Sequence, residues 1–445
     1  MEKTRVIISG IGEYQPPWKL DNQYLFDKYI SLVDQRLFIR NAIEILRGGF
    51  LAKKQTEAIR VLESDRGFGI KSRYWEVLPE DDDVPVPDYP RIKSFKELLR
   101  HPETTRFSKG WSYITEQLKL SGAIDPASHT DSAMAFNAGQ MAVQTADIDP
   151  ARIGGVIHAT ATPDATGGYS AANRIAHSLG VSDQAFTYDL VTGCCGVMDA
   201  VFLAHSFLSQ PDAGYDAVLV TGSNLTSARV KAFLAEKPKG WRAHYSYPGV
   251  QNALLFGDGA GAFILQRVPD NDCGILHIKK AHRAIDNPAF LLEGGSALPM
   301  TKNGLRLSLE QYYVHSKKVF KNVARIMEET VEQTADEAEA KSLGRLHPRD
   351  ADLVVAHQPS RVTLESIRKK LEIDREKMAD VLETRGNLVA ASVPTAMFSA
   401  LDRLSPGNIL HLIGIGAGWH VAHAIIRVGP EIEKMKSRAR RATTE

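Results

Sequence analysis

Residues 257–265 read GDGAGAFIL, a glycine-rich turn that leads into an apolar run. Residues 414–418 read GIGAG and lead into a second apolar run. Glycine turns of this kind are common wherever two backbones approach closely, so one copy alone says little about the fold. The recurrence of the motif before an apolar run is more informative, because it indicates an internal repeat.

A second pair of similar runs supports the repeat. Residues 155–159 and 353–357 are both strand-like runs that end on polar residues, and each precedes one copy of the glycine motif. The common order predicts two similar halves, over about residues 1–268 and 273–428. Residues 429–445 are rich in charged residues with an excess of basic ones, a composition that predicts a solvated tail.

From Asp131 onward the chain alternates helix and strand patterns. Small residues at helical spacing occupy positions 135–142, and strand patterns follow at residues 155–159 and 185–191. Alternation at this spacing predicts an α/β architecture. The less regular residues from about 20 to 125 are expected to form an inserted cap.

The expected cap has two parts. Apolar residues recur at helical spacing from Asn22 to about Leu62, which predicts two or more helices. Residues 80–83 read EDDD and are followed by several prolines, a composition typical of an exposed loop.

Composition excludes several classes of protein. Among 445 residues, 54 Lys and Arg balance 53 Asp and Glu, and 43% of the residues are hydrophobic. These values argue against a disordered chain or a nucleic-acid-coating protein. Cys194, Cys195 and Cys273 are too few for a disulfide framework and lack metal-type spacing. With no signal-peptide core and no apolar run of about 18 residues, we expect a soluble cytoplasmic protein without membrane partner, metal or cofactor.

The cysteine pair lies between a strand pattern and a helix pattern, in the run TGCCGV at residues 192–197. A thiol at a helix N-terminus gains a lowered pKa from the unpaired N–H groups and the helix dipole, and the thiolate is a nucleophile. The alternative is that Cys194 and Cys195 are buried and behave as small hydrophobic residues.

Two polar residues in the second half are candidates for the same site. His357 follows the apolar strand pattern at residues 353–356, where a side chain can open into a cleft. Asn387 opens a run of small residues. Alternatively, His357 is a hydrogen-bonded core residue and Asn387 a turn residue.

Taken together and in this order, Cys194, His357 and Asn387 resemble the catalytic trio of the β-ketoacyl-acyl-carrier-protein synthase III family in the thiolase superfamily. The resemblance runs from about Asp131 to Val428. It includes the flanking motifs LFGDGAGA (255–262), VAHQ (355–358) and GNLVAASVP (386–394).

The resemblance implies a five-layered αβαβα thiolase fold and a homodimer that uses acyl-CoA or acyl-carrier-protein thioesters. It further implies decarboxylative Claisen condensation with a malonyl-type thioester, with Cys194 as nucleophile and Cys195 as its small neighbour. His357 and Asn387 would bind the carbonyl that becomes an enolate. The main-chain N–H groups of Cys194 and Ala417 would form the oxyanion hole, with alanine replacing a usual glycine.

The chain also departs from the family pattern. Glu63 and Gly67 stand where the family has the tryptophan and arginine that contact coenzyme A, just before Gly69-Ile70. In the family, a large residue of the partner subunit gates the acyl pocket. Its position falls near Gly168 in this chain, which predicts a roomier pocket.

A basic stretch after His357 has two interpretations. It is either a solvated helix face or a surface that docks an acidic carrier protein, and two of its members match basic docking positions of the family. The residues are Arg361, Arg368, Lys369 and Lys370.

Three other functions remain open at this stage. A non-decarboxylating head-to-head condensation would need a carboxylate base near Cys194, for which Asp164 or a cap residue is a candidate. An acyltransferase would pass the acyl group to an alcohol or amine. A non-catalytic partner subunit would keep the fold without the chemistry.

Overall fold

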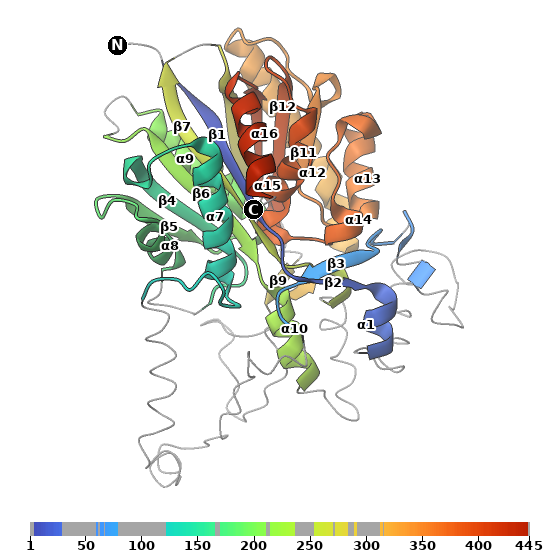
Figure 1. Cartoon of the computed structure of the whole chain (residues 1–445). Helices are drawn as coiled ribbons and strands as arrows, with labels where there is room; N and C mark the ends of the chain where they lie inside the picture. Colours follow the sequence, from blue (N-terminus) through green and yellow to red (C-terminus); the bar gives the residue numbers. More distant parts are fainter. Residues whose placement is uncertain are drawn as a thin grey trace, which may run out of the picture.

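Two mixed β-sheets form the centre of the protein, and helices lie between them and on both outer sides (Figure 1). The computed structural model describes residues 4–28, 59–60, 63–65, 67–78, 122–164, 170–210, 214–235, 253–269, 272–283, 289–291, 312–314 and 316–443. Gly168 and most of the predicted 20–125 insertion, including residues 80–83, lie outside the described residues.

The first sheet has the strand order β1-β7-β6-β4-β5. The strands are β1 (Thr4–Tyr14), β4 (Ile153–Thr160), β5 (Phe186–Leu190), β6 (Ala217–Asn224) and β7 (Gly259–Pro269). β7 is antiparallel to β1 and β6, whereas β6, β4 and β5 are parallel to one another. Parallel neighbours require crossover connections, and helices supply them here.

The second sheet has the strand order β11-β12-β13-β8. The strands are β8 (Gly274–His282), β11 (Leu353–Ala356), β12 (Ile409–Gly416) and β13 (His420–Arg427). β11 is parallel to β12, and β13 is antiparallel to both β12 and β8.

The two sheets repeat one arrangement, as the glycine motifs predict. β7 and β13 each follow or overlap a glycine motif, and each lies antiparallel to its neighbours β6 and β12. The earlier runs form β4 and β11, which lie parallel to β6 and β12. The internal repeat is therefore structural.

Helices complete five layers. α7 and α8 pack on the outer face of the first sheet, α9 and α15 lie between the sheets, and α12 packs on the second sheet with α13 beside it (Figure 1). Their bounds are α7 (Asp131–Ala146), α8 (Ala171–Leu179), α9 (Gly196–Leu208), α12 (Ser316–Ala340), α13 (Arg361–Lys370) and α15 (Ser392–Ser399). The expected αβαβα thiolase fold is confirmed. None of the described helices is long and apolar enough to cross a membrane.

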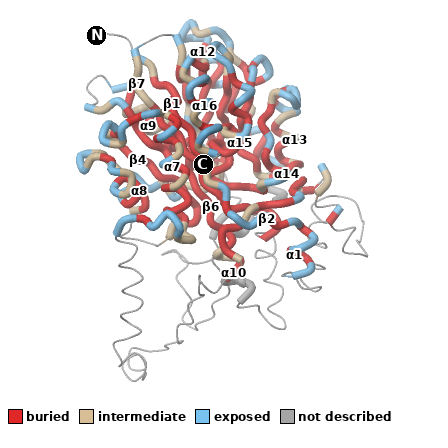
Figure 2. Tube along the Cα trace, in the orientation of Figure 1, coloured by how far each residue is buried: buried red, intermediate tan, exposed pale blue. Residues whose placement is uncertain are grey.

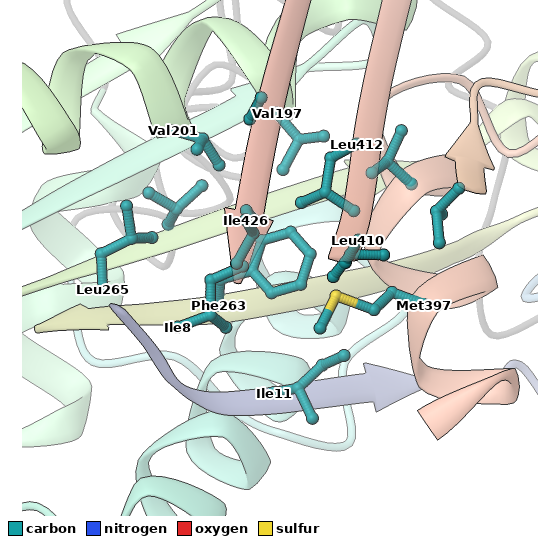
Figure 3. Packing of buried hydrophobic residues seen from close by; sticks show 14 of the residues in the cluster. Ile8, Ile11, Val197, Val201, Phe263, Leu265, Met397, Leu410, Leu412 and Ile426 are labelled. Atoms are coloured by element: carbon teal, nitrogen blue, oxygen red, sulfur yellow. The ribbon is translucent and has the colours of Figure 1, made fainter. Parts of the chain in front are cut away.

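The largest apolar cluster joins the two halves around the central helices. Val197 and Val201 of α9 lie in the same cluster as Phe263 of β7 and Leu412 of β12, and all four are fully buried (Figure 3). Burial follows the strands of both sheets, and the exposed residues lie mainly on outer helices and loops (Figure 2). The turn between β5 and α9 therefore rests on a rigid base.

Capping groups and a glycine explain the position of α7. Thr130 Oγ1 accepts a hydrogen bond from the Ala133 N–H at 3.2 Å, and Asp147 ends the helix with a φ of 55°. A Cβ on Gly12 of β1 would lie 2.0 Å from the Ala138 carbonyl oxygen, so only glycine allows this close approach.

The C-terminal residues differ from the expected solvated tail. They form α16 (Glu431–Ala442), which packs on α7 and β1. Ile432, Met435 and Ala439 are buried in the largest core cluster. The prediction was wrong because these three residues, at positions i, i+3 and i+7, lie among seven Lys, Arg and Glu side chains whose charges hide one apolar face.

The described part of the insertion is tied to the main fold. β2 (Trp18–Asp21) and β3 (Ser72–Trp75) form a two-stranded antiparallel sheet beside α1 (Asn22–Lys28). Phe26 and Trp75 are buried in a cluster with Val230 of α10 (Thr226–Ala235). Of the predicted helices over residues 22–62, α1 is described and most of the remainder lies outside the described residues. The remaining strands and α-helix of the described residues are β9 (Ala289–Leu291), β10 (Tyr312–Val314) and α14 (Leu382–Arg385).

Two buried histidines lie on adjacent strands of the second sheet. His411 Nδ1 of β12 is 2.8 Å from His423 Nε2 of β13, and both side chains are fully buried. Burial, and to a smaller extent His347, lower the pKa of His411 to about 3. The unfolded chain, with an ordinary histidine pKa of about 6.5, therefore binds a proton at mildly acidic pH that the folded chain excludes.

The free energy of unfolding should consequently decrease as the pH falls below 6.5. Between pH 6.5 and pH 5, His411 alone should contribute about 2 kcal/mol to this loss, which urea unfolding at the two pH values would measure. His411→Gln should remove that contribution, whereas His177→Gln, at an exposed position on α8, should retain the wild-type pH dependence. Equal pH dependence in His411→Gln and the wild type would contradict the prediction.

Candidate active site

Cys194 lies on the turn between β5 and α9. The 3₁₀ turn Gly193–Cys195 leads directly into α9, and Gly193 has a φ of 64°, a conformation that favours glycine. Cys194 packs against an apolar cluster that includes Ile70 and Val389. The structure thus places the thiol at a helix N-terminus, as predicted, although in apolar surroundings.

These surroundings reverse the expected acidity of the thiol. Burial raises the pKa of Cys194 to about 12, and a backbone hydrogen bond lowers it only in part. The expectation of a lowered pKa was wrong because desolvation of a thiolate outweighs the stabilisation at the helix end. At neutral pH the thiol carries its proton, and a base must accept this proton when the sulfur attacks.

His357 directly follows β11 and is buried. Its N–H donates to the Ile413 carbonyl at 2.8 Å, which extends the pairing of β11 with β12 by one residue. Burial lowers the pKa of His357 to about 3, and its Nδ1 makes no hydrogen bond within the described part of the chain. The imidazole is therefore neutral and retains a ring nitrogen that can exchange a proton or a hydrogen bond.

The backbone around Asn387 is fixed by Leu255 and Gly257, at the start of the LFGDGAGA segment. Its N–H donates to the Leu255 carbonyl at 3.0 Å, and its carbonyl accepts from the Gly257 N–H at 3.1 Å. A Cβ on Gly257 would lie 2.0 Å from the Arg385 carbonyl oxygen, so this approach requires glycine.

The side-chain amide of Asn387 is oriented by two hydrogen bonds. Oδ1 accepts from the Val389 N–H at 2.9 Å, and Nδ2 donates to the Pro359 carbonyl at 3.3 Å. Val389 has a φ of 50°, which is rare for a β-branched residue, and the bond to Oδ1 supports this conformation. Since Oδ1 is engaged, Nδ2 is the group with a remaining donor. Pro359 lies two residues after His357, so the Asn387 and His357 segments are in contact.

The end of β12 lies against the cysteine turn. A Cβ on Gly416 would be 2.7 Å from the Cys195 nitrogen and 3.4 Å from the Cys194 nitrogen. Ala417 follows in the 3₁₀ turn Ala417–Trp419, which contacts Gly193–Cys195. The turn Val389–Ala391, just after Asn387, also contacts Gly193–Cys195. Segments that carry Cys194, Ala417 and Asn387 therefore converge.

Among the basic residues after His357, Arg361 differs from the expectation. It is buried, forms an ion pair with Asp380, and its N–H donates to the Phe68 carbonyl at 2.7 Å. Its side chain is therefore part of the protein interior and is excluded from a docking surface.

The other three basic residues lie toward the surface. Arg368 pairs with Glu365 at 2.9 Å, and Lys370 pairs with Glu328 at 3.0 Å. Lys369 and Lys370 are exposed at the end of α13.

Residues at the altered coenzyme A positions have structural contacts. Glu63 accepts a hydrogen bond from Asn22 Nδ2 at 3.0 Å, and the Gly67 N–H donates to the Ser64 carbonyl at 2.9 Å. Gly69 has a φ of 67°, and a Cβ there would lie 2.2 Å from Arg361 Cβ, so this segment packs tightly on α13.

Asp164, the named candidate for a carboxylate base, caps α7 instead. Its two oxygens accept from the N–H groups of Asp131 and Ser132 at 2.7 and 3.2 Å. A carboxylate held at a helix N-terminus in this way is stabilised as an anion and is engaged with the backbone.

Asp199, a charged residue on the otherwise apolar first turns of α9, is a further residue near the site that the sequence did not predict. Its side chain is 1% exposed and forms an ion pair with Lys280 of β8 at 3.1 Å. The available signal was a carboxylate among the apolar residues Val197, Val201 and Ala204.

Comparisons with known proteins find relatives of one kind over most of the chain. The sequence family "3-Oxoacyl-[acyl-carrier-protein (ACP)] synthase III" matches residues 188–282, and the corresponding C-terminal family matches residues 343–428. Beta-ketoacyl-[acyl-carrier-protein] synthase III of Roseiflexus sp. is 29% identical over 341 residues, which cover 76% of this chain and 94% of the relative. The protein of the same name from Rhizorhabdus wittichii is 29% identical over 300 residues, or 67% of this chain and 84% of the relative.

Solved structures show the same fold. The 3-oxoacyl-(acyl carrier protein) synthase III FabH from Pseudomonas aeruginosa aligns with a TM-score of 0.63 and 19% identity, over 96% of this chain and 98% of that one. Cerulenin-bound OleA from Xanthomonas campestris aligns with a TM-score of 0.60 and 18% identity, over 95% of this chain and 97% of that one. At these identities the likeness establishes the fold alone.

Proposed function

Because this chain belongs to the β-ketoacyl-acyl-carrier-protein synthase III-like family of the thiolase superfamily, we propose that it catalyses a decarboxylative Claisen condensation. It would join an acyl thioester to a malonyl-type thioester through an acyl group on Cys194. One observation carries the proposal. The turn that carries Cys194 contacts the turn that follows Asn387, and the Asn387 amide is hydrogen-bonded to the segment that follows the neutral His357.

In the first half-reaction, Cys194 Sγ attacks the carbonyl carbon of the acyl thioester. The N–H groups of Cys194 and Ala417 would stabilise the oxyanion, because donors that are already in place need no reorganisation. The oxyanion collapses, the bond to the leaving sulfur breaks, and that thiolate takes the proton that Cys194 gave up. Because burial lowers the pKa of His357 to about 3, His357 would relay this proton to the leaving sulfur without remaining charged.

In the second half-reaction, a malonyl-type thioester loses carbon dioxide. The electrons of the broken C–C bond move into the thioester carbonyl, and hydrogen bonds from His357 and Asn387 Nδ2 would stabilise the enolate. The enolate carbon attacks the acyl-cysteine, the bond to Cys194 Sγ breaks, and the released thiolate takes up one proton from solvent. The product is a β-ketoacyl thioester.

Screening by intact mass tests the function directly. The protein is incubated with acyl thioesters of increasing chain length, then with malonyl thioester. An adduct on Cys194 that disappears with release of carbon dioxide and formation of a β-ketoacyl product supports condensation. Transfer of the acyl group to an added alcohol or amine would instead support an acyltransferase, and the absence of any adduct would contradict both.

We also propose that the acyl donor or acceptor is borne by an acidic carrier protein. Glu63 and Gly67 offer neither an aromatic ring nor a cation to coenzyme A, and Lys369 and Lys370 are exposed on α13. Exposed lysines would attract an acidic partner by long-range electrostatics, which salt weakens.

Charge reversal at Lys369 and Lys370 should raise the KM for a carrier-borne substrate by about five- to tenfold at low salt. The KM for a small thioester mimic should stay unchanged, because the mimic does not need α13. Lys434→Glu, at an exposed position on α16, serves as the charge-matched control for each single reversal at Lys369 or Lys370. Equal effects on both substrates, or no effect on either, would remove the docking role.

We propose a homodimer that pairs through β5. This strand is at the edge of the first sheet, and Tyr188 and Val191 are 48% and 64% exposed there. Tyr188 lies on an aromatic cluster with Phe186 and Phe207. An edge strand of the described sheet with an exposed aromatic side chain favours pairing with a second copy. Sedimentation should give twice the mass of one chain, and Tyr188→Lys should give one chain; a wild-type monomer would contradict the proposal.

A further inference from the structure

A buried ion pair connects the two halves beside the cysteine turn. Asp199 is in the first turn of α9, and Lys280 is on β8 of the second sheet, with Asp199 Oδ1 and Lys280 Nζ 3.1 Å apart. The Asp199 side chain is 1% exposed, while that of Lys280 is 32% exposed. Asp199 Oδ2 is buried and makes no hydrogen bond within the described residues. The positive charge of Lys280 is thus the main group that stabilises the buried negative charge of Asp199. Separating the two would leave that carboxylate buried and unpaired, which costs free energy.

Cys195 connects this pair to the backbone of the cysteine turn. Its Sγ lies 3.5 Å from Asp199 Oδ1, and burial together with Asp199 raises the pKa of this thiol, so it keeps its hydrogen and donates it. On its other side, a Cβ on Gly414 would be 3.2 Å from Cys195 Sγ. Cys195 therefore lies between Asp199 and β12.

This arrangement bears on both proposed oxyanion donors. The first donor, the Cys194 N–H, lies one residue before Cys195. The second donor, the Ala417 N–H, lies one residue after Gly416, where an added Cβ would be 2.7 Å from the Cys195 nitrogen. A shift of α9 relative to the second sheet would change the spacing of the two N–H groups. Lys280 extends from that sheet to α9, across the boundary where such a shift would occur.

We propose that Asp199 and Lys280 are positioning residues, which hold the N–H groups of Cys194 and Ala417 at the spacing that an acyl oxyanion requires. The inference rests on the proposed function, because it concerns the acylation of Cys194. Cys195 adds a weak thiol hydrogen bond to Asp199, and the ion pair between Asp199 and Lys280 is the stronger of the two interactions.

The test uses the full chain and an acyl thioester that acylates the wild type. Lys280→Met should lower the acylation rate constant by about 10- to 100-fold, the scale of a misplaced reacting group, while the KM changes less than about twofold. Alkylation of Cys194 by iodoacetamide needs no oxyanion hole, so its rate should also change less than about twofold. Lys280→Arg should retain most of the acylation rate.

A double variant separates positioning from stability. Lys280→Met alone leaves Asp199 buried and unpaired, so its thermal midpoint should fall, whereas Asp199→Asn/Lys280→Met should recover that midpoint but acylate as slowly as the single variant. Recovery of the acylation rate together with the midpoint would overturn the proposal, since the pair would then only support the fold.

A neighbouring lysine provides the matched control. Lys279, also on β8, forms an ion pair with Glu337 of α12 on the other side of the sheet. Lys279→Met should acylate as the wild type does, and wild-type acylation in Lys280→Met would overturn the positioning role alone. A wild-type protein that is alkylated on Cys194 but forms no acyl adduct would overturn the proposed function and, with it, this inference.

Discussion

Cys194→Ala is expected to abolish every acyl adduct, whereas Cys195→Ala is expected to keep acylation within about threefold of the wild type. The two thiols are adjacent in sequence but differ in position. Cys194 lies at the start of α9 beside the turn that carries Ala417, while Cys195 is fully buried and directed toward Asp199. Intact-mass measurement after incubation with an acyl thioester, followed by peptide mapping, would locate the adduct.

Thermal unfolding provides the control for this comparison. Both substitutions remove one sulfur atom, and the Cys195 cavity is the deeper one, so Cys195→Ala should be the less stable of the two variants. If acylation were lost only because the variants are less stable, Cys195→Ala would therefore lose more acylation than Cys194→Ala. An adduct on Cys195, or an adduct retained in Cys194→Ala, would contradict the assignment of the nucleophile.

The fold could be predicted from local patterns to the extent that those patterns reflect packing. The two glycine motifs marked equivalent antiparallel strands, since only glycine permits the close approaches at Gly257 and Gly416. Helix α16 was missed for the opposite reason. Its apolar face has only three core residues within a highly charged segment, and that face becomes recognisable only when α7 and β1 are present to cover it.

For the site, chain order and motif indicated Cys194, His357 and Asn387, but their electrostatics depend on tertiary contacts. The raised pKa of Cys194 arises from apolar neighbours such as Ile70 and Val389, which are more than a hundred residues away in the chain. Asp199 shows the same limit, because its partner Lys280 lies on another sheet. The sequence shows that Asp199 carries a charge, but it does not show which residue pairs with that charge in the folded protein.

Asn387→Ala is expected to slow the loss of carbon dioxide from a malonyl thioester by about 100-fold, or about 3 kcal/mol, while acylation of Cys194 stays largely intact. The reason is that Nδ2 would contact only the carbonyl that becomes an enolate, and the acyl oxyanion would use main-chain donors. Single-turnover assays can measure both half-reactions separately, by the appearance of the acyl adduct and by the release of carbon dioxide.

Alanine at this position also removes Oδ1, which accepts from the Val389 N–H and supports the strained φ at that residue. Asn387→Asp separates the two roles, because a carboxylate keeps the acceptor for Val389 but replaces the donor with a negative charge. Decarboxylation should therefore be at least as slow in Asn387→Asp as in Asn387→Ala, although the Asp variant keeps the turn. If Asn387→Asp decarboxylated at the wild-type rate, or if both half-reactions fell equally in both variants, Asn387 would have a structural role and would not be an enolate donor.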